Sequence, residues 1–309
     1  MTPEVRRAAE ILRAGGLVAF PTETVYGLGA DASSASAVAR LYAVKGRPAD
    51  HPVIVHLDSL ERALAWARDL PADARILAER FWPGPLTLIL KRSEKAKDFV
   101  TGGQPSVGIR VPSHPVAQAL LKEFGGGIAA PSANRFGHVS PTTAAHVRDD
   151  LGGDVDLVLD GGASEVGIES TIVDLSGGVA VLLRPGKISR AELEKFVELK
   201  DKTDSSPRHS GGLERHYAPR TPTRLVPTHA LDKEIAPLGD RVAVLAFSRP
   251  DERVDFWLRM PRDPNAYAQK LYAALRELDG AGCELILIEA PPEASEWAAV
   301  RDRLMRACG

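Results

Sequence analysis

The sequence predicts an α/β protein with a mixed sheet, divided into a larger N-terminal domain and a smaller C-terminal one. Short apolar runs alternate with segments of helical period, which is typical of α/β folds. Hairpin-like pairs of runs, such as 171–173 and 181–183, interrupt this alternation and favour some antiparallel pairing. After Glu198 the composition becomes polar and almost loses aliphatic periodicity. We therefore expect domains at 1–198 and 223–309, joined by a linker over 199–222.

The first domain is expected to begin with a capped helix. Thr2 supplies a capping hydroxyl, Pro3 suits the first helical position, and Gly15 can end the helix. The apolar run 17–20 predicts a buried strand that stops at Pro21 and opens into a binding loop of hydroxyls and glycines. A helix over 35–44 should follow and be stopped by Pro48.

The later elements follow from similar signals. A Pro-Gly-Pro turn precedes the apolar run 86–90, and Ser59 and Pro71 each suit the start of a helix. The elements expected after the binding loop are a strand at 53–57, helices at 59–68 and from 71, strands at 86–90 and 107–111, a helix at 115–124, a strand at 128–130, a helix at 141–150, and strands at 157–159, 171–173 and 181–183. The C-terminal domain should hold strands at 241–247 and 285–288 and helices at 263–278 and 293–306, a βαβ-type unit.

Composition and charge narrow the possible function classes. Lys plus Arg number 39 and Asp plus Glu number 41, for a net charge of −2, so no global basic field favours bulk nucleic-acid binding. The charged N-terminus does not suit a signal peptide, and no apolar run approaches the length of a membrane span. Cys283 and Cys308 lack metal-ligand spacing and do not suggest a disulfide framework. We expect a cytoplasmic protein without a membrane partner.

Polar residues follow several predicted strands, where open α/β sheets bind ligands. Lys45 and Arg47 flank a glycine, and loop cations beside hydroxyl donors suit a polyphosphate. As loop cations they are expected to be exposed and to contribute little to stability. Each residue also has a structural explanation, such as a solvated helix end at Lys45 or a core histidine at His56.

The standard nucleotide and hydrolase motifs are absent from the sequence. There is no G-x-x-x-x-G-K-[ST], no G-x-G-x-x-G after a strand, and no H-E-x-x-H, C-x-x-C or G-x-S-x-G. The pattern predicts an anion site with neither a nucleophile–base pair nor a metal cage. Its candidate residues are Thr22, Lys45, Arg47, His56, Arg110, Ser132, Asn134, Ser140, Ser170 and Arg184.

Several ordered motifs together resemble one known family. They are P-T-E-T-V-Y-G-L-G, K-G-R-P-A-D-H-P, F-W-P-G-P-L-T-L, P-S-A-N-x-x-G, and E-S-T-I-V-D-L followed by L-L-R-P-G. They resemble the YrdC-type domain. The chain as a whole is similar to the long-form threonylcarbamoyl-AMP synthases, including R-H-Y-A-P in the linker. The resemblance implies a twisted mixed sheet around a positively charged cavity, then a linker that folds over the site and a small Rossmann-like α/β domain.

The resemblance also implies a reaction, in which L-threonine, bicarbonate and ATP give L-threonylcarbamoyladenylate and pyrophosphate. Mg²⁺ would be bound through the phosphates of ATP, with no protein side chain assigned as its ligand. The product would pass to a tRNA threonylcarbamoyl-transfer complex, and this step would not require tRNA binding. Lys45 and Arg47 would be catalytic. The implied ATP contacts are Lys45, Arg47, Ala49, Ser106, Ser132, Asn134, Ser140, Arg184 and Tyr217. The implied threonine contacts are Thr22, His56, Arg110, Ala130 through its backbone, and Ser170.

Two other functions fit parts of the sequence. A concave basic surface could bind double-stranded RNA or a ribosome, although the nearly neutral net charge weighs against this. A carbamoyl-transfer maturation factor uses a related domain, but it would need additional acylphosphatase-like and zinc-binding modules. The sequence lacks the cysteine clusters that such modules would need.

Overall fold

The computed structural model describes residues 2–213 and 215–309, so two residues of the expected domains and linker, Met1 and Glu214, lie outside the described residues. The chain forms two compact units. The first comprises residues up to Phe136 and then Pro141–Gly212. The second comprises Gly137–Ser140 and Leu213–Gly309.

The first unit is built on a mixed sheet of ten strands in the order β10-β9-β8-β4-β5-β3-β6-β2-β1-β7. The pairs β1–β7, β3–β5, β4–β8 and β9–β10 are parallel, and the other neighbouring pairs are antiparallel. The strands are β1 (Val18–Phe20), β2 (Gly27–Asp31), β3 (Ile54–His56), β4 (Leu86–Lys91), β5 (Ser106–Arg110), β6 (Ile128–Ala129), β7 (Leu157–Val158), β8 (Thr171–Asp174), β9 (Ala180–Arg184) and β10 (Leu199–Asp201).

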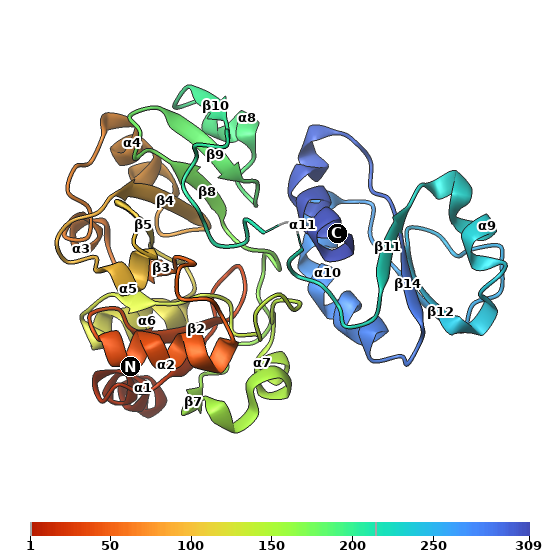
Figure 1. Cartoon of the computed structure of the whole chain (residues 1–309), viewed down its shortest axis with the longest axis horizontal. Helices are drawn as coiled ribbons and strands as arrows, with labels where there is room; N and C mark the ends of the chain where they lie inside the picture. Colours follow the sequence, from red (N-terminus) through yellow and green to blue (C-terminus); the bar gives the residue numbers. More distant parts are fainter. Residues whose placement is uncertain (1, 214) are drawn as a thin grey trace. The chain divides into compact units, whose positions relative to one another are not determined.

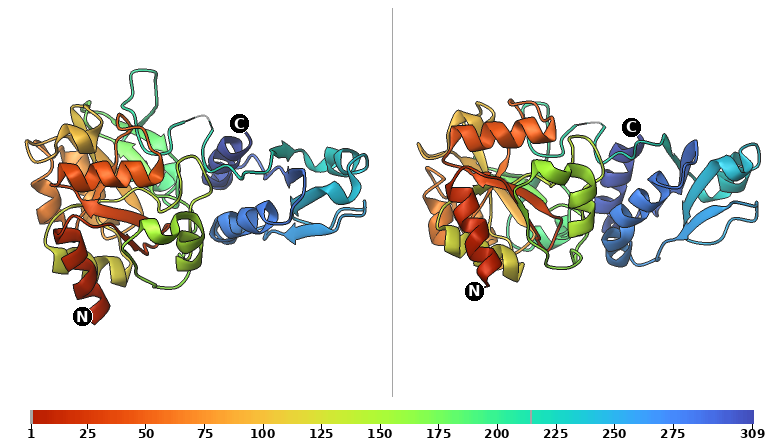
Figure 2. Two further views of the ribbon diagram at one scale, coloured as in Figure 1. Left: turned by 60° about the horizontal axis from the view of Figure 1, so that its bottom comes forward. Right: turned by 90° about the horizontal axis from the view of Figure 1, so that it is seen from below.

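Helices cover both faces of this sheet. The side chains of β1 alternate, with Val18 and Phe20 packing against α1 and α6 while Ala19 packs with α2 and α7. Figure 2 shows α1 and α2 on opposite sides of the β1–β2 pair. The helices of this unit are α1 (Pro3–Arg13), α2 (Ala35–Lys45), α3 (Leu60–Leu64), α4 (Ala72–Phe81), α5 (Asp98–Thr101), α6 (Pro115–Phe124), α7 (Ala144–Leu151) and α8 (Arg190–Leu193).

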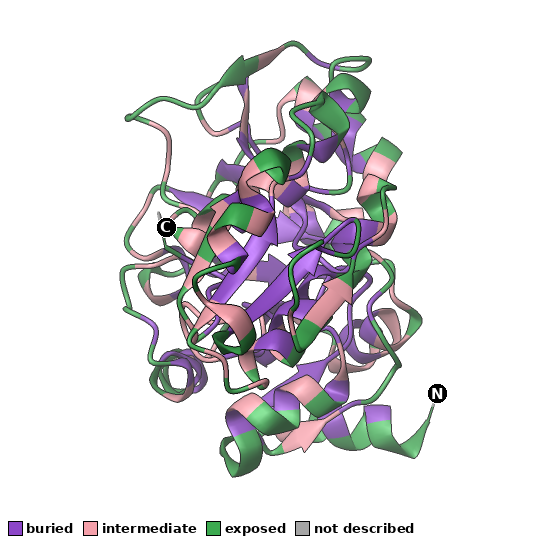
Figure 3. Cartoon of the chain, turned by 90° about the vertical axis from the view of Figure 1, so that its right-hand side faces the viewer, coloured by how far each residue is buried: buried purple, intermediate pink, exposed green. Residues whose placement is uncertain are grey.

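The second unit contains a four-stranded parallel sheet in the order β11-β14-β12-β13 (Figure 1). Its strands are β11 (Thr223–Val226), β12 (Val242–Ala246), β13 (Phe256–Arg259) and β14 (Leu285–Glu289), and its helices are α9 (Leu231–Ile235), α10 (Pro264–Asp279) and α11 (Ala298–Cys308). Asp263 caps α10 by accepting from the Ala266 amide. Figure 3 shows buried residues concentrated in strands, with exposed residues on outer helix faces.

The mixed α/β fold and most predicted elements are confirmed, but four predictions at the level of elements were wrong. The expected binding loop contains strand β2, because Gly27–Asp31 pairs with β1 on one side and β6 on the other. The helix expected to reach residue 68 ends at Leu64. Its continuation instead bonds to the end of β4, where Arg68 N donates to the Lys91 carbonyl.

In the other two wrong predictions, residues expected in a helix or in the linker form backbone hydrogen bonds with other segments instead. The helix expected from Pro141 begins at Ala144, because the Pro141 carbonyl accepts from the Tyr26 amide. The start of the expected linker, Leu199–Asp201, forms β10 and pairs parallel to β9. Strands β11 and β13 were not predicted.

In the described part of the chain, no helix has the length and apolar character that crossing a membrane requires.

Candidate active site

The end of α2 meets the P-S-A-N loop at Lys45. Gly46 adopts a left-handed conformation with φ +63°, so the chain turns away immediately after the last helical residue. The Lys45 side chain is 2% exposed and its Nζ donates to the Ser132 carbonyl at 2.6 Å and to the Asn134 carbonyl. Burial, and secondarily the Arg47 charge, lowers the pKa of Lys45 well below its usual value. Lys45 therefore joins two predicted segments that are far apart in the sequence.

Arg47 is also buried rather than solvated. Its side chain donates to the Pro52 carbonyl at 2.8 Å and to the His51 carbonyl at 3.4 Å, and its guanidinium lies 5.4 Å from the centre of the Phe136 ring. With Arg47 only 7% exposed, the expectation that both loop cations face solvent was wrong. The carbonyl groups that surround these cations explain how two buried positive charges are accommodated so close together.

The P-T-E-T loop forms a socket around Arg110. Thr24 Oγ1 accepts from Arg110 Nη1 at 2.8 Å, and Glu23 Oε1 lies 2.7 Å from Nη2, with both charged side chains about 5% exposed. The hydroxyl of Thr22 donates to the Val25 carbonyl at 2.6 Å and lies 2.9 Å from Thr24 Oγ1. The Thr22 hydroxyl is therefore hydrogen-bonded to residues of its own loop. Arg110 Nη2 is buried and makes no aligned hydrogen bond within the described residues, although it is ion-paired.

A third group surrounds Ser170 at the start of β8. Its hydroxyl lies 2.8 Å from Thr87 Oγ1 and accepts from Arg184 Nη2 at 3.1 Å, while its carbonyl accepts from Arg184 Nε at 3.0 Å. The glycine of the R-P-G turn permits this approach, because a Cβ at Gly186 would lie 2.5 Å from the Thr171 amide nitrogen. The E-S-T and R-P-G motifs are thus one packed unit.

These groups are connected to one another within the first unit. Thr87 and Arg110 are directly opposite each other in the β4–β5 ladder. The residues around Arg110 and the residues around Ser170 therefore lie side by side. The Pro52 carbonyl accepts from both Arg47 and the Ser210 hydroxyl, and the Ser210 carbonyl accepts from Arg184 Nη1 at 2.9 Å. Arg47 and Arg184 are therefore linked through Pro52 and Ser210, and Lys45 lies two residues before Arg47 in the chain.

The linker lies over this region in the first unit. Arg208 N donates to Gln104 Oε1 at 2.8 Å, and Gln104 Nε2 donates back to the Arg208 carbonyl at 3.0 Å. Beneath Arg208–Ser210 is a cavity of about 20 Å³, whose lining includes Ser106 and Thr87. A space of this size holds about one water, so a nucleotide could enter here only if the segment moved.

His56 lies beside Arg110, its register partner in the β3–β5 ladder. Burial, followed by the positive charge of Arg110, lowers the pKa of His56 to about 3. The imidazole is therefore neutral at physiological pH. Its Nδ1 is 3.3 Å from the Ile54 carbonyl, and that carbonyl also accepts from the Ala130 amide at 3.0 Å. A ligand contact by the Ala130 backbone would therefore come from its carbonyl oxygen.

Three predicted residues stand apart from this network. Ala49 is exposed in the turn after Arg47. Ser140 and Tyr217 belong to the second unit, where both are buried. The predicted residues that the structure connects within the first unit are Thr22, Lys45, Arg47, His56, Ser106, Arg110, Ala130, Ser132, Asn134, Ser170 and Arg184.

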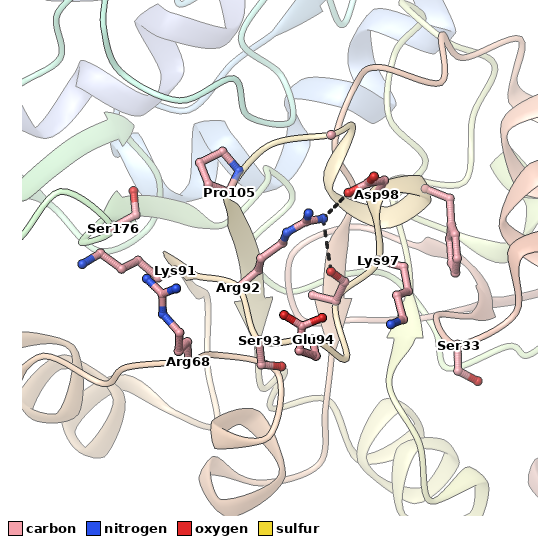
Figure 4. Close-up of a pocket in the computed structure, with 13 residues that line it drawn as sticks. Ser33, Arg68, Lys91, Arg92, Ser93, Glu94, Lys97, Asp98, Pro105 and Ser176 are labelled. Carbon is pink, nitrogen blue, oxygen red and sulfur yellow. Dashed lines mark hydrogen bonds and ion pairs between the residues drawn. The ribbon is translucent and has the colours of Figure 1, made fainter.

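A larger hollow of about 920 Å³ lies at the other end of the β4–β5 pair. Figure 4 shows Lys91 and Arg68 on one side of it and Lys97 on the other, with Arg92 turned toward Asp98. Its lining contains none of the predicted site residues, and Arg92 is ion-paired with Asp98. Although this hollow is the larger of the two cavities described here, it is not the candidate site, because none of the predicted residues line it.

The sequence reasoning missed Glu23, Thr24, Thr87, Gln104 and Ser210. Glu23 and Thr24 stand in the P-T-E-T motif and Thr87 in F-W-P-G-P-L-T-L, so the motifs already carried a signal for these three. Gln104 and Ser210 act on backbone groups distant in sequence, and no local pattern marks such contacts.

Comparisons with known proteins cover almost the whole chain. Residues 10–186 match the Sua5/YciO/YrdC family, described as telomere recombination, and residues 188–309 match the threonylcarbamoyl-AMP synthase C-terminal domain. The chain is 40% identical to the threonylcarbamoyl-AMP synthase of Pyrococcus abyssi over 99% of this chain and 94% of that protein. It is 38% identical to that of Bacillus subtilis over 99% of this chain and 93% of that one.

A solved structure agrees with these relatives. The crystal structure of P. abyssi Sua5 complexed with L-threonine has a TM-score of 0.91 and 38% identity to this chain, covering 98% of this chain and 94% of that one. The agreement extends over both units and not only over the YrdC-type part. The chain belongs to the Sua5/YciO/YrdC family, in the long form that carries the threonylcarbamoyl-AMP synthase C-terminal domain.

Proposed function

We infer that this chain is a threonylcarbamoyl-AMP synthase, which converts L-threonine, bicarbonate and ATP into L-threonylcarbamoyladenylate and pyrophosphate. The observation that carries this conclusion is full-length similarity to proteins of that name, at 40% and 38% identity over 99% of the chain. The RNA-binding alternative is not favoured, because no comparable observation supports it. The match of 188–309 to the synthase C-terminal domain also favours the synthase over a maturation factor.

In this proposal the enzyme is a nucleotidyltransferase whose residues 1–198 form the catalytic domain, 199–222 the lid and 223–309 a small second domain. The ATP phosphates bind the cations Lys45, Arg47 and Arg184. The Pro52–Ser210 contacts support this assignment for Arg47 and Arg184, because they connect these two side chains. Further nucleotide contacts are assigned to Ala49, Ser106, Ser132, Asn134, Ser140 and Tyr217. Mg²⁺ would be held by the phosphate oxygens of ATP, where it would supply charge neutralisation. Within the described residues there is no group of three or more His, Cys, Asp or Glu side chains that could hold a metal ion, so no protein ligand is assigned to it.

Threonine is assigned to the neighbouring group of Thr22, His56, Arg110, Ala130 and Ser170. Arg110 Nη2 is the donor proposed for the α-carboxylate, because Nε and Nη1 bind Gly84 and Thr24 while Nη2 makes no aligned hydrogen bond. The α-carboxylate would share Nη2 with Glu23, which is ion-paired with it at 2.7 Å. The Thr22 hydroxyl is engaged within its loop, so its methyl or backbone would face the ligand. The neutral His56 can accept or donate one hydrogen bond, but it supplies no positive charge near neutral pH.

The chemistry needs positioning more than a protein nucleophile. The threonine amine combines with bicarbonate to form a carbamate and water, and a carbamate oxygen then attacks the α-phosphorus of ATP while pyrophosphate leaves. Cations held in fixed positions stabilise the charge that develops in such an in-line transfer. Because carbamates are labile in water, a lid that excludes solvent serves the reaction. The product is then passed to a tRNA threonylcarbamoyl-transfer complex in the cytoplasm.

The test is threonine-dependent pyrophosphate release. Purified protein is incubated with ATP, bicarbonate and labelled threonine, and both pyrophosphate and the labelled adenylate are measured. Serine and valine serve as matched substrates. Serine lacks one methyl and should be discriminated by ~1–3 kcal/mol, whereas valine lacks the hydroxyl and can be rejected more strongly. Pyrophosphate release that does not depend on threonine would contradict the proposal.

A further inference from the structure

Glu23 is a buried carboxylate in the P-T-E-T loop, between Thr22 and Thr24. Its side chain is only 4% exposed, which is rare for a glutamate. Its backbone carbonyl accepts from the Val166 amide at 2.8 Å, and its Oε2 accepts from the Ser113 amide at 3.2 Å. Glu23 is therefore held by its backbone and by one carboxylate oxygen, while the other oxygen, Oε1, takes part in neither hydrogen bond.

The guanidinium of Arg110 is held in a similar way. Its Nε donates to the Gly84 carbonyl at 3.3 Å, and its Nη1 donates to Thr24 Oγ1 at 2.8 Å. The remaining nitrogen, Nη2, lies on the side of Glu23. Each of the two charged side chains is thus anchored in the first unit and directs one remaining polar atom toward the other.

These two atoms lie together without forming an aligned hydrogen bond. Glu23 Oε1 is 2.7 Å from Arg110 Nη2, yet neither atom has a hydrogen-bond partner with acceptable geometry within the described residues. Buried polar atoms almost always make hydrogen bonds, so a neighbouring pair that makes none calls for an explanation. Both atoms are covered in this structure, so a ligand reaches them only when the residues above them move.

Stability alone does not explain the pair, because a buried ion pair is often no more stabilising than apolar residues of similar volume. The charges suggest a ligand instead. His56, the register partner of Arg110, is neutral at physiological pH, so Glu23 and Arg110 give a local charge balance of zero. The zwitterion of an amino acid is also neutral and carries its ammonium and carboxylate groups on one carbon atom. A carboxylate oxygen beside a guanidinium nitrogen is complementary to those two groups.

We propose that Glu23 is a further threonine-binding residue, whose Oε1 accepts from the α-amino group while Arg110 Nη2 donates to the α-carboxylate. The inference rests on the proposed function, in which threonine binds beside Arg110. It assigns to Glu23 the selection of α-amino acids over acids that have the same side chain but no amino group. The same contact holds the amino nitrogen in one place, where bicarbonate must meet it.

The experiment measures the Kd values of two ligands by calorimetry on the full-length protein, without ATP or bicarbonate. The ligands are L-threonine and (R)-3-hydroxybutanoate, which is threonine without its amino group. Wild-type protein should bind threonine at least about tenfold more tightly, because the analogue leaves the buried Glu23 oxygen unpaired. Glu23→Gln should weaken threonine binding about tenfold, through loss of a charge-assisted hydrogen bond. It should leave the binding of the analogue unchanged or make it tighter.

This pattern separates substrate binding from a purely structural role. If Glu23 only held Arg110 in place, Glu23→Gln would weaken both ligands equally, and that result would overturn the inference. An unchanged Kd for threonine in the variant would overturn it too, as would equal binding of both ligands by wild-type protein. If Glu23→Gln does not fold, Glu23→Asp is measured with the same criteria, because it withdraws the oxygen by one methylene group.

Glu289→Gln is the matched control. Glu289 is a buried glutamate of the second unit that also accepts two hydrogen bonds, from the Thr228 hydroxyl and the Phe247 amide. Its replacement should change neither Kd. Threonine-dependent pyrophosphate release by wild-type protein is measured separately. Its absence would overturn the proposed function, whereas its presence without the expected pattern of Kd values would overturn only the role of Glu23.

Discussion

At the scale of single residues, Lys45 holds the protein together through the same ammonium group that is proposed to bind ATP. Its ammonium group binds the Ser132 and Asn134 carbonyls, and thereby holds the P-S-A-N loop against the end of α2. A phosphate that binds Lys45 would meet a group already fixed in place, so little side-chain entropy would be lost on binding. Such a preorganised cation is more useful for catalysis than a mobile one.

Replacing Lys45 should therefore cost both activity and stability. Lys45→Met keeps much of the volume but leaves two buried carbonyl groups without their donor. We expect the free energy of unfolding to fall by about 1–3 kcal/mol, together with loss of adenylate formation. Urea denaturation and the pyrophosphate assay measure the two effects. Lys91→Met, at the exposed end of β4, is the control and should change neither. An unchanged urea midpoint for Lys45→Met would contradict the buried arrangement.

His56 makes a pH-dependent contribution to stability. Its pKa is about 3 in the folded chain, against an ordinary value of 6.5, so between these values the unfolded chain binds a proton that the folded chain does not. Stability should therefore fall as the pH is lowered from 6.5 toward 3, by up to about 1.4 kcal/mol per pH unit from this residue.

The comparison with His56→Gln isolates this effect. Urea denaturation of both proteins between pH 7 and pH 4 should show a smaller loss of stability in the variant, because glutamine does not titrate. Parallel curves for the two proteins would show that His56 is protonated normally in the folded state.

At the scale of elements, the linker is attached to the first unit by the reciprocal hydrogen bonds of Gln104. These two bonds, each worth about 0.5–1.5 kcal/mol, hold Arg208 above the small cavity. Gln104→Ala should let the segment open about ten times more often. Amide hydrogen exchange at Arg208, whose own N–H is one of the two donors, reports this directly.

Gln118→Ala is the matched control for this measurement. Gln118, on α6, also donates to a carbonyl, that of Pro112, and no hydrogen bond joins it to the linker within the described residues. Exchange at Arg208 should be the same in that variant as in wild type. Equal exchange in the Gln104 variant would mean that other contacts, such as that of Arg184 with Ser210, hold the segment unaided.

The same scale shows what local sequence can and cannot predict. Helices α1 and α10 were predictable because Thr2 and Asp263 are capping residues followed by proline and a regular apolar stripe. Strand β2 was not predictable from its own residues. Gly27–Asp31 has low strand propensity, and its strand conformation comes from pairing with β1 and β6.

The candidate site also contains residues that the sequence could predict and contacts that it could not. Arg110 was a candidate because it ends a predicted strand, but its partner Glu23 lies far away in the sequence, and no periodicity links the two. The burial of Lys45 was equally hidden, because the carbonyl groups that bind it come from the distant P-S-A-N loop. Arg47 bonds to His51 and Pro52 of its own loop, and no sequence pattern marks such backbone acceptors. Contacts from side chains to distant backbone groups leave no pattern in the composition.

At the scale of the whole molecule, the main apolar clusters of the first unit lie within residues 1–200. A chain ending at residue 200 should therefore fold, but it lacks Ser210 and Tyr217. We expect its turnover to fall about tenfold or more, since misplaced contacts far from the reacting atoms are costly, while its melting temperature falls much less. Full activity in the truncated chain would exclude a role for the linker.

The segment Gly137–Ser140 has a separate consequence, because it ties the middle of the chain to the C-terminal part. The Gly137 carbonyl accepts from Ala218, and the Val139 carbonyl accepts from Arg276 of α10. A protease that nicks the chain once near Lys202 would break the covalent path but not these bonds. The two fragments should elute together from a sizing column and come apart only in denaturant, so an intact elution profile would not prove an intact polypeptide.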